Sequence, residues 1–254
     1  MMKWCVVMLV VMLTMPATQS AKAEQITIAV ASNFTAAMRE IVARFEQQTG
    51  HRVKVSYGSS GKLFAQVQHG APFQAFFSAD QAKPIALEKA GLVVPGSRFT
   101  YAFGGLVLWS SQPELVDEEA HVLKQGNFNK LALANPKLAP YGSAAIDVLK
   151  KMDLLEVTRG QWVQGENISQ TYQFVASGNA DLGFVALSQV TRQGAISEGS
   201  YWVVPAELYH PIRQDAVLLN KGKNSAATQA LLRFVQGGIA AGIIKHYGYQ
   251  IALL

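Results

Sequence analysis

The sequence alternates short apolar runs, rich in β-branched residues, with longer amphipathic stretches, and this alternation constrains the fold more than any other feature. Residues 26–31 form the first apolar run, and in the stretch that follows Phe34, Met38, Ile41 and Phe45 recur at helical spacing. Strand-like and helix-like segments that alternate along a chain are typical of βαβ units on a largely parallel sheet. The sequence therefore predicts an α/β fold.

The same pattern continues to the end of the chain. Predicted strands are residues 26–31, 53–57, 75–79, 100–110, 131–134, 162–164, 182–187 and 216–220, and predicted helices are residues 62–68, 81–90, 139–152, 168–176, 225–235 and 238–247, besides a first helix that ends at Gly50. The strand at 100–110 contains Gly104-Gly105, where we expect it to kink and cross into a second lobe. Because no Pro-, Gly- or Ser-rich linker separates the halves, we expect one lobe from residues 24–104 and 211–254 and another from residues 105–210.

Residues 1–23 have the parts of a secretory signal peptide. A basic start is followed by an apolar run at residues 4–15 and by Ala21-Lys22-Ala23, a small-x-small cleavage pattern. The apolar run is shorter than the roughly 18 residues that a membrane span needs. We therefore expect cleavage after Ala23 and an exported, periplasmic protein. Cleavage would lower the net charge from +5 to +3 and remove Cys5, the one cysteine, which excludes disulfides and cysteine-ligated metals from the mature protein.

The sequence lacks several motifs of catalysis and nucleic-acid binding. The five histidines are far apart and have no metal-ligand spacing. The segment Gly58-Ser59-Ser60-Gly61-Lys62 resembles the end of a P-loop, but Leu63 stands where that motif needs Ser or Thr. The modest positive charge is not clustered, which argues against a nucleic-acid partner. An exported α/β hydrolase with Ser32 or Ser60 as nucleophile stays open as an alternative, although no histidine motif supplies its base.

Polar residues gather where a predicted strand gives way to a predicted helix. Four such junctions hold Ser32-Asn33, Ser59-Ser60, Tyr141 and Glu166-Asn167-Ile168. In open α/β sheets, ligands bind beyond the carboxyl ends of the strands, and helix N-termini there offer unpaired N–H groups to an anion. Ser and Asn are also ordinary helix N-caps, which is the simpler interpretation of any single junction. Their spread over both halves favours an anion site in a cleft.

Six segments of the chain resemble one known family. They are residues 28–34 (IAVASNF), 56–63 (SYGSSGKL), 70–80, 135–142, 165–168 (GENI) and 178–185 (GNADLGFV). In order and spacing they are similar to segments of the periplasmic molybdate-binding proteins of molybdate ABC transporters. The resemblance extends over nearly the whole chain that follows the expected signal peptide.

This resemblance implies a two-lobed periplasmic-binding-protein fold of type II, in which each lobe is a mainly parallel sheet flanked by helices and two hinge crossings join the lobes. It implies that the protein captures molybdate or tungstate and delivers it to an inner-membrane ABC permease with its ATPase. The expected protein is a monomer with no catalytic residues, no cofactor, no metal-ion ligands and no nucleic-acid partner. A binding protein for sulfate or another tetrahedral oxyanion is the alternative within the same class.

The resemblance also implies which residues contact the oxyanion, through hydroxyls and backbone amides. Carried over by position, they are Ser32, Asn33, Ser60, Tyr141 and Ile168. The chain departs from the family pattern at Ala186, where some members have a tyrosine, and we expect Tyr141 to supply that hydroxyl from the other side of the anion. It departs again at Phe73-Gln74, where a small residue and an acid are usual, and we interpret this as a change in packing.

Overall fold

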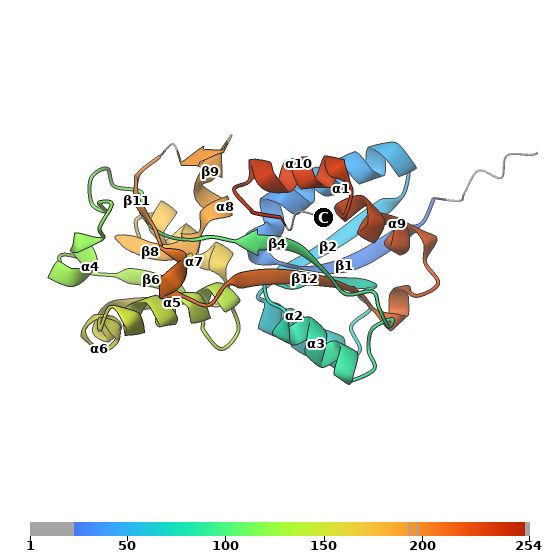
Figure 1. Ribbon diagram of the computed structural model, residues 1–254, viewed down its shortest axis with the longest axis horizontal. Coiled ribbons are helices and arrows are strands. Elements are labelled where there is room, and N and C mark those ends of the chain that lie inside the picture. Colours follow the sequence, from blue (N-terminus) through green and yellow to red (C-terminus); the bar gives the residue numbers. More distant parts are fainter. Residues whose placement is uncertain (1–22, 193, 197, 252–254) are drawn as a thin grey trace, which may run out of the picture.

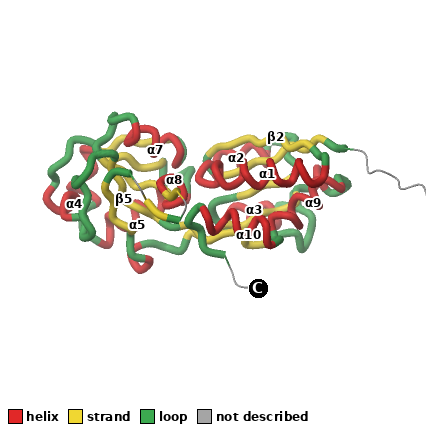
Figure 2. The backbone as a smooth tube through the Cα atoms, turned by 90° about the horizontal axis from the view of Figure 1, so that it is seen from above, coloured by secondary structure: helices red, strands yellow, loops and turns green. Residues whose placement is uncertain are grey.

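The computed structural model of the chain describes residues 23–192, 194–196 and 198–251. The expected signal peptide lies outside the described residues except for its last position, Ala23. Two lobes lie side by side, each built on one five-stranded sheet (Figure 1). Seen from above, two stretches of chain run between the lobes (Figure 2).

Lobe 1 is built on a sheet with the strand order β2-β1-β3-β12-β4. Its strands are β1 (Gln25–Ala31), β2 (Arg52–Gly58), β3 (Ala75–Phe77), β4 (Phe99–Gly104) and β12 (Ile212–Leu218). One face is covered by α1 (Thr35–Thr49), α9 (Ala226–Val235) and α10 (Gly238–His246), and the other by α2 (Ser60–Gln68) and α3 (Ala82–Lys89) (Figure 1). Alternate residues of β1 serve the two faces, since Ile28 and Val30 pack on the α1 side and Ala29 on the α2 side.

Lobe 2 is built on a sheet with the strand order β11-β5-β8-β6-β7. Its strands are β5 (Leu106–Ser110), β6 (Leu131–Ala134), β7 (Trp162–Gly165), β8 (Leu182–Ala186) and β11 (Ser200–Val203). The helices α5 (Pro140–Lys151) and α7 (Ile168–Ala176) both pack against the sheet. The remaining elements are short: α4 (His121–Gln125), α6 (Leu155–Thr158), α8 (Leu187–Val190) and the hairpin of β9 (Thr191–Arg192) and β10 (Ala195–Ile196).

The two sheets share one topology. The order β2-β1-β3-β12-β4 in lobe 1 corresponds to β7-β6-β8-β5-β11 in lobe 2, and each sheet has two parallel pairings followed by two antiparallel ones. The predicted two-lobed α/β fold is confirmed, and in each sheet four strands run the same way while one, β12 or β5, is reversed. Strands β12 and β5 enter their sheets from the other lobe, so they run against neighbours that end at the edge between the lobes.

The crossings between the lobes differ from the predicted elements. The predicted kinked strand at 100–110 is two strands in different sheets, β4 and β5, separated by Gly105. The chain returns through residues 204–211, and β12 begins at Ile212, earlier than the predicted start at residue 216. Strand β3 ends at Phe77, short of the predicted end at residue 79. Strand β11 and the short helices α4, α6 and α8 were not predicted.

The C-terminal helices belong to the core of lobe 1. Leu231 of α9 and Ile244 of α10 are buried in the same cluster as Phe34 and Met38. Among the described residues, no single helix has the length and apolar character of a membrane span, while α9 and α10 meet that test only as a pair bent by 57°.

Candidate functional site

The four predicted junctions meet at one small pocket between the lobes. The residues that line it are Ala31, Ser32, Asn33, Gly58, Ser59, Ser60, Ala79, Ala139, Pro140, Tyr141 and Ile168. They include every residue for which the sequence predicts contact with the ligand. The cavity volume of about 10 Å³ is near the minimum that holds a water molecule and far below the roughly 300–1,000 Å³ of pockets for organic ligands. Only a ligand of a few atoms suits such a pocket.

Corresponding elements of the two lobes supply the pocket, which explains why the junctions converge. In lobe 1, β1 leads through a short 3-10 helix, η1 (Ser32–Phe34), into α1, and β2 leads into α2. In lobe 2, β6 leads into α5 and β7 leads into α7. All four strands end at the edge where the lobes meet. The pocket therefore receives chain turns and helix N-termini from both sides, each with the partial positive charge of its backbone dipoles.

Ser60 is held in place by the turn that follows β3. Its side chain is buried, and its Oγ accepts a hydrogen bond of 2.9 Å from the backbone N–H of Ala79. The turn is closed by Asp80, whose Oδ1 accepts from Ser78 Oγ and from the N–H of Lys83, at 3.1 Å each. Because the Ser60 oxygen acts as the acceptor toward Ala79, the hydroxyl hydrogen of Ser60 is free to be donated to a ligand.

The first turns of the helices that begin at the pocket have backbone N–H groups without an acceptor among the described residues. The first N–H groups of a helix have no acceptor within the helix. In the described chain, no backbone or side-chain acceptor engages the amides of Ser60, Tyr141 or Ile168. In α7, the Oδ1 of Asn167 accepts instead from the amides of Ser169 and Gln170, at 3.0 and 3.1 Å. That cap satisfies the next two donors and leaves the amide of Ile168 for the pocket.

The side chain of Asn33 turns away from this set of donors. Its Nδ2 donates to Gln214 Oε1 at 2.8 Å and to the Tyr249 hydroxyl at 3.0 Å, so both of its N–H bonds are used within the protein. Its backbone carbonyl accepts from Tyr249 at 2.8 Å and from Ser188 at 3.2 Å. Asn33 thus lines the pocket while its side-chain amide joins a buried polar network.

Tyr141 reaches from lobe 2 into the same network. Its hydroxyl lies 3.4 Å from Gln214 Nε2, and a methyl group at Gly104 would overlap that hydroxyl. Burial raises the pKa of Tyr141 well above its ordinary value, and burial likewise raises the pKa of Tyr101 and of Tyr249. All three therefore remain neutral hydroxyls at neutral pH. Sequence patterns missed Gln214, since no motif surrounds it and its partners are far away along the chain.

The lobes touch around the pocket through hydrogen bonds and one ion pair. The N–H of Gly61 donates to the carbonyl of Leu138 at 2.8 Å, and Ser169 Oγ donates to the carbonyl of Ser32 at 3.1 Å. Lys62 and Glu166, on opposite lobes, form a solvent-exposed ion pair at 3.1 Å. The pocket is therefore closed in by contacts between the lobes.

The chemistry of the lining is that of neutral hydrogen-bond donors. It contains no His, Asp, Glu, Lys or Arg. No group of three or more His, Cys, Asp or Glu that could hold a metal ion is found among the described residues. A nucleophilic Ser32 or Ser60 would need a base within reach, and the lining offers none. An anion, in contrast, finds amide and hydroxyl donors on both sides of the pocket.

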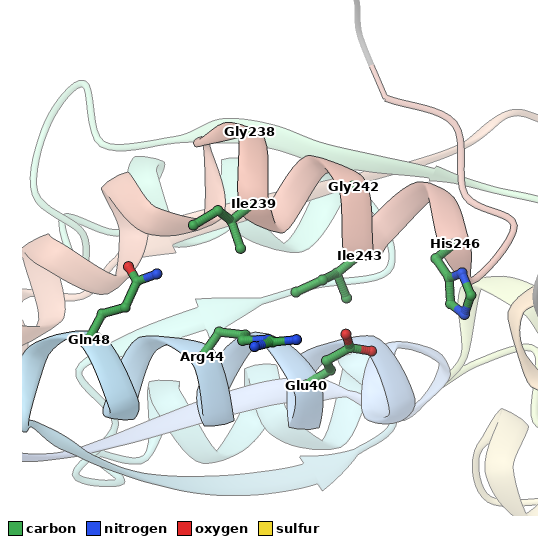
Figure 3. A pocket seen from close by; sticks show the side chains of 8 residues that line it. All are labelled: Glu40, Arg44, Gln48, Gly238, Ile239, Gly242, Ile243 and His246. Carbon is green, nitrogen blue, oxygen red and sulfur yellow. The ribbon is translucent and has the colours of Figure 1, made fainter.

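A larger and more open groove lies elsewhere, in lobe 1. It has a volume of about 560 Å³ and runs between α1 and α10 in lobe 1 (Figure 3). Glu40, Arg44 and Gln48 of α1 face Ile239 and His246 of α10 across it (Figure 3). None of the predicted contact residues lies in this open groove.

Comparison with known proteins agrees with this geometry. The model of a family described as "Bacterial extracellular solute-binding protein" matches residues 26–250. The molybdate-binding protein ModA of Azotobacter vinelandii is 53% identical over 232 residues, which cover 91% of this chain and 92% of that protein. ModA of Rhodobacter capsulatus is 48% identical over 229 residues, which cover 90% and 89%. The solved structure of the periplasmic molybdate-binding protein of Azotobacter vinelandii has a TM-score of 0.86 at 40% identity and covers 90% of this chain and 100% of its own.

The family match spans almost all of the described chain, and both relatives are covered over most of their length. These findings confirm the resemblance that the sequence motifs indicated. The chain belongs to the bacterial extracellular solute-binding proteins, alongside relatives that bind molybdate.

Proposed function

We propose that this protein captures molybdate, or the similar tungstate, in the pocket between its lobes and delivers it to an ABC permease with its ATPase. The observation that carries the proposal is the convergence of neutral donors from both lobes on a pocket too small for an organic ligand. The names of the two most identical relatives described above support molybdate as the ligand.

A site made only of donors suits a fully ionised oxyanion. Each hydrogen bond to a charged group contributes about 1.5–3 kcal/mol, so a handful of them supports tight binding. Neutral donors also avoid a buried cation that would lose its partner when the ligand leaves. A protonated anion such as hydrogen phosphate presents a donor of its own, which finds no carboxylate in the lining.

The contacts we assign follow from the geometry of the junctions. The hydroxyls of Ser32, Ser60 and Tyr141 and the backbone amides of Asn33 and Ile168 donate to the oxyanion. The amides of Ser60 and Tyr141 add two further donors, because neither has an acceptor in the described chain. No catalytic step is assigned to any of these residues.

Capture and release follow from motion about the two crossings. We assign residues 24–104 and 211–254 to one lobe and residues 105–210 to the other, with hinges at Gly104-Gly105 and at residues 204–211. Opening there would break the contacts that Ser169 and Gly61 make across the cleft and expose the anion. The protein would act as a monomer in the periplasm after removal of residues 1–23.

Thermal unfolding with and without molybdate tests the proposal. At a free ligand concentration near 1,000 times Kd, binding stabilises the folded state by about 4 kcal/mol, which raises the Tm of a chain this size by roughly 8–16 °C. Tungstate should give a similar rise, and hydrogen phosphate should give none. The absence of a shift with both molybdate and tungstate would refute the proposal.

Competition titration separates molybdate from sulfate, the alternative ligand. Both are tetrahedral oxyanions without protons at neutral pH, so cavity size must distinguish them. We expect sulfate to displace bound molybdate only at a large excess. Displacement at equal concentrations would assign the protein to sulfate instead.

A further inference from the structure

We propose that Gln214 is a positioning residue of the oxyanion site, which fixes the hydroxyl of Tyr141 so that its hydrogen is donated to the ligand. The inference rests on the proposed function and deepens it. It assigns a role to a residue that does not line the pocket and that belongs to the strand entering lobe 1 from the hinge.

The place of Gln214 is fixed by a break in the sheet. Its side chain is fully buried, and the pairing of β12 with β4 shifts register between Gln214 and Asp215. Asp215 is anchored on the other side of that irregularity by Arg98 and by Thr100 Oγ1, at 2.7 Å each. With Asp215 held there, Gln214 points into the polar network between the lobes.

The donor and acceptor in each hydrogen bond of this network can be assigned by starting from Tyr249. That hydroxyl donates its one hydrogen to the carbonyl of Asn33 at 2.8 Å, so its oxygen accepts from Asn33 Nδ2 at 3.0 Å. The second hydrogen of Asn33 Nδ2 is then donated to Gln214 Oε1 at 2.8 Å. Tyr101 places its hydroxyl 3.0 Å from the same oxygen and 3.0 Å from the carbonyl of Ser78, so its one hydrogen can be donated to either. The contact with Asn33 Nδ2 therefore identifies the oxygen of the Gln214 amide, and hence its nitrogen.

The nitrogen of Gln214 faces Tyr141. Nε2 has only hydrogens to offer, so at 3.4 Å the Tyr141 oxygen is the acceptor and its own hydrogen is free. Gly104 makes room for this pair, because a Cβ at Gly104 would overlap the Tyr141 hydroxyl and lie 2.8 Å from Nε2. Tyr141 is one of the residues that line the pocket. The proposal requires its free hydrogen to reach an anion bound there, which the Tyr141→Phe variant below tests. By donating to the Tyr141 oxygen, Gln214 leaves the Tyr141 hydroxyl to act as a donor toward the ligand.

A double-mutant cycle with molybdate tests this role. Tyr141→Phe removes the hydroxyl, and Gln214→Met removes the donor that orients it without adding charge. Each change alone should weaken molybdate binding in a calorimetric titration by about tenfold. If Gln214 acts through Tyr141, the double variant should bind within about twofold of Tyr141→Phe alone. Losses that multiply, or a Gln214→Met protein that binds as tightly as the original, would overturn the inference.

Two further variants test whether weaker molybdate binding could result simply from the loss of a buried hydrogen bond. Ser200→Ala removes a buried hydroxyl of lobe 2 away from both crossings, which accepts from the N–H of Val116 at 2.9 Å, and should leave the Kd for molybdate unchanged. Gln214→Glu keeps an acceptor for Asn33 but turns a second carboxylate oxygen toward Tyr141, which would take the hydroxyl hydrogen from the ligand. Gln214→Glu should therefore weaken molybdate binding more when Tyr141 is present than when it is already replaced by Phe. This comparison also provides the test if the Gln214→Met protein does not fold.

The unaltered protein, titrated in the same series, separates this inference from the proposed function. If it fails to bind molybdate, the proposed function falls and the inference falls with it. If it binds molybdate while Gln214 and Tyr141 show independent effects, only the positioning role of Gln214 is refuted.

Discussion

Ser60 shows how one hydroxyl can serve both the fold and the ligand. Its oxygen accepts from Ala79 at 2.9 Å, which leaves its hydrogen for the anion. We expect Ser60→Ala to weaken molybdate binding by about 1–3 kcal/mol, measured by calorimetric titration. As a matched control, Ser225→Ala removes a buried serine that caps α9, with its Oγ 3.1 Å from the N–H of Thr228. That change should lower the free energy of unfolding by about 1 kcal/mol and leave the affinity alone. Equal affinities of both variants would exclude Ser60 as a contact.

The sequence predicted residues of the site unevenly, and chain distance explains the difference. Ser32, Ser60 and Ile168 each stand at a strand-to-helix junction, and such a junction is visible within a few residues of sequence. Gln214 is separated from Asn33 by 181 residues and from Tyr141 by 73, so only the folded chain brings them together. The orientation of the Asn33 side chain was equally invisible, because Tyr249 and Gln214 determine it.

Among the elements, α7 tests how a helix start contributes to the anion site. Asn167 caps the helix through the amides of Ser169 and Gln170. Asn167→Asp preserves this cap, since Asp is an equally good N-cap, but places a negative charge beside the proposed anion. We expect an unchanged free energy of unfolding in urea and a weaker, salt-sensitive affinity for molybdate. Asn167→Ser, a neutral cap, should preserve both quantities. Tight binding by the Asp variant would place the anion away from α7.

Elements with a strong local pattern were predicted, and those that depend on tertiary pairing were not. Helix α1 has an apolar face of several turns and ends at Gly50, which adopts a left-handed conformation with φ of 73°. Strand β11 has only four residues, alternately buried and exposed, at the edge of its sheet. The antiparallel direction of β5 and β12 follows from the two crossings between the lobes, which no local periodicity encodes.

At the scale of the whole molecule, three buried tyrosines near the hinge limit stability at high pH. Burial raises the pKa of Tyr101, Tyr141 and Tyr249 above the ordinary value of 10.0. Above about pH 10 the unfolded chain loses these protons while the folded chain keeps them, so the folded state loses about 1.4 kcal/mol per pH unit for each tyrosine. Urea unfolding from pH 9 to 11.5 should show this decline. Tyr101→Phe should make the decline shallower, whereas Phe at the exposed Tyr201 should leave it unchanged.

The Lys62–Glu166 ion pair joins the two lobes beside the pocket and should favour the closed arrangement. Both side chains are about half exposed, so the pair is worth at most about 1 kcal/mol. We expect Lys62→Met and Glu166→Gln each to weaken molybdate binding by about twofold to fivefold, mainly through faster release in stopped-flow measurements. The double variant should match the single ones, and 0.5 M salt should remove most of the difference because it screens exposed charges.

A matched ion pair within one lobe provides the control for this prediction. Arg159 and Glu156 form an exposed pair at 2.8 Å within lobe 2, so Arg159→Met should leave the release rate of molybdate unchanged. Opposite effects of the two lobe-joining variants would contradict the role in closure. If Glu166→Gln tightened binding while Lys62→Met weakened it, the two charges would be acting on the anion through space, and closure would depend on the hydrogen bonds of Ser169 and Gly61 alone.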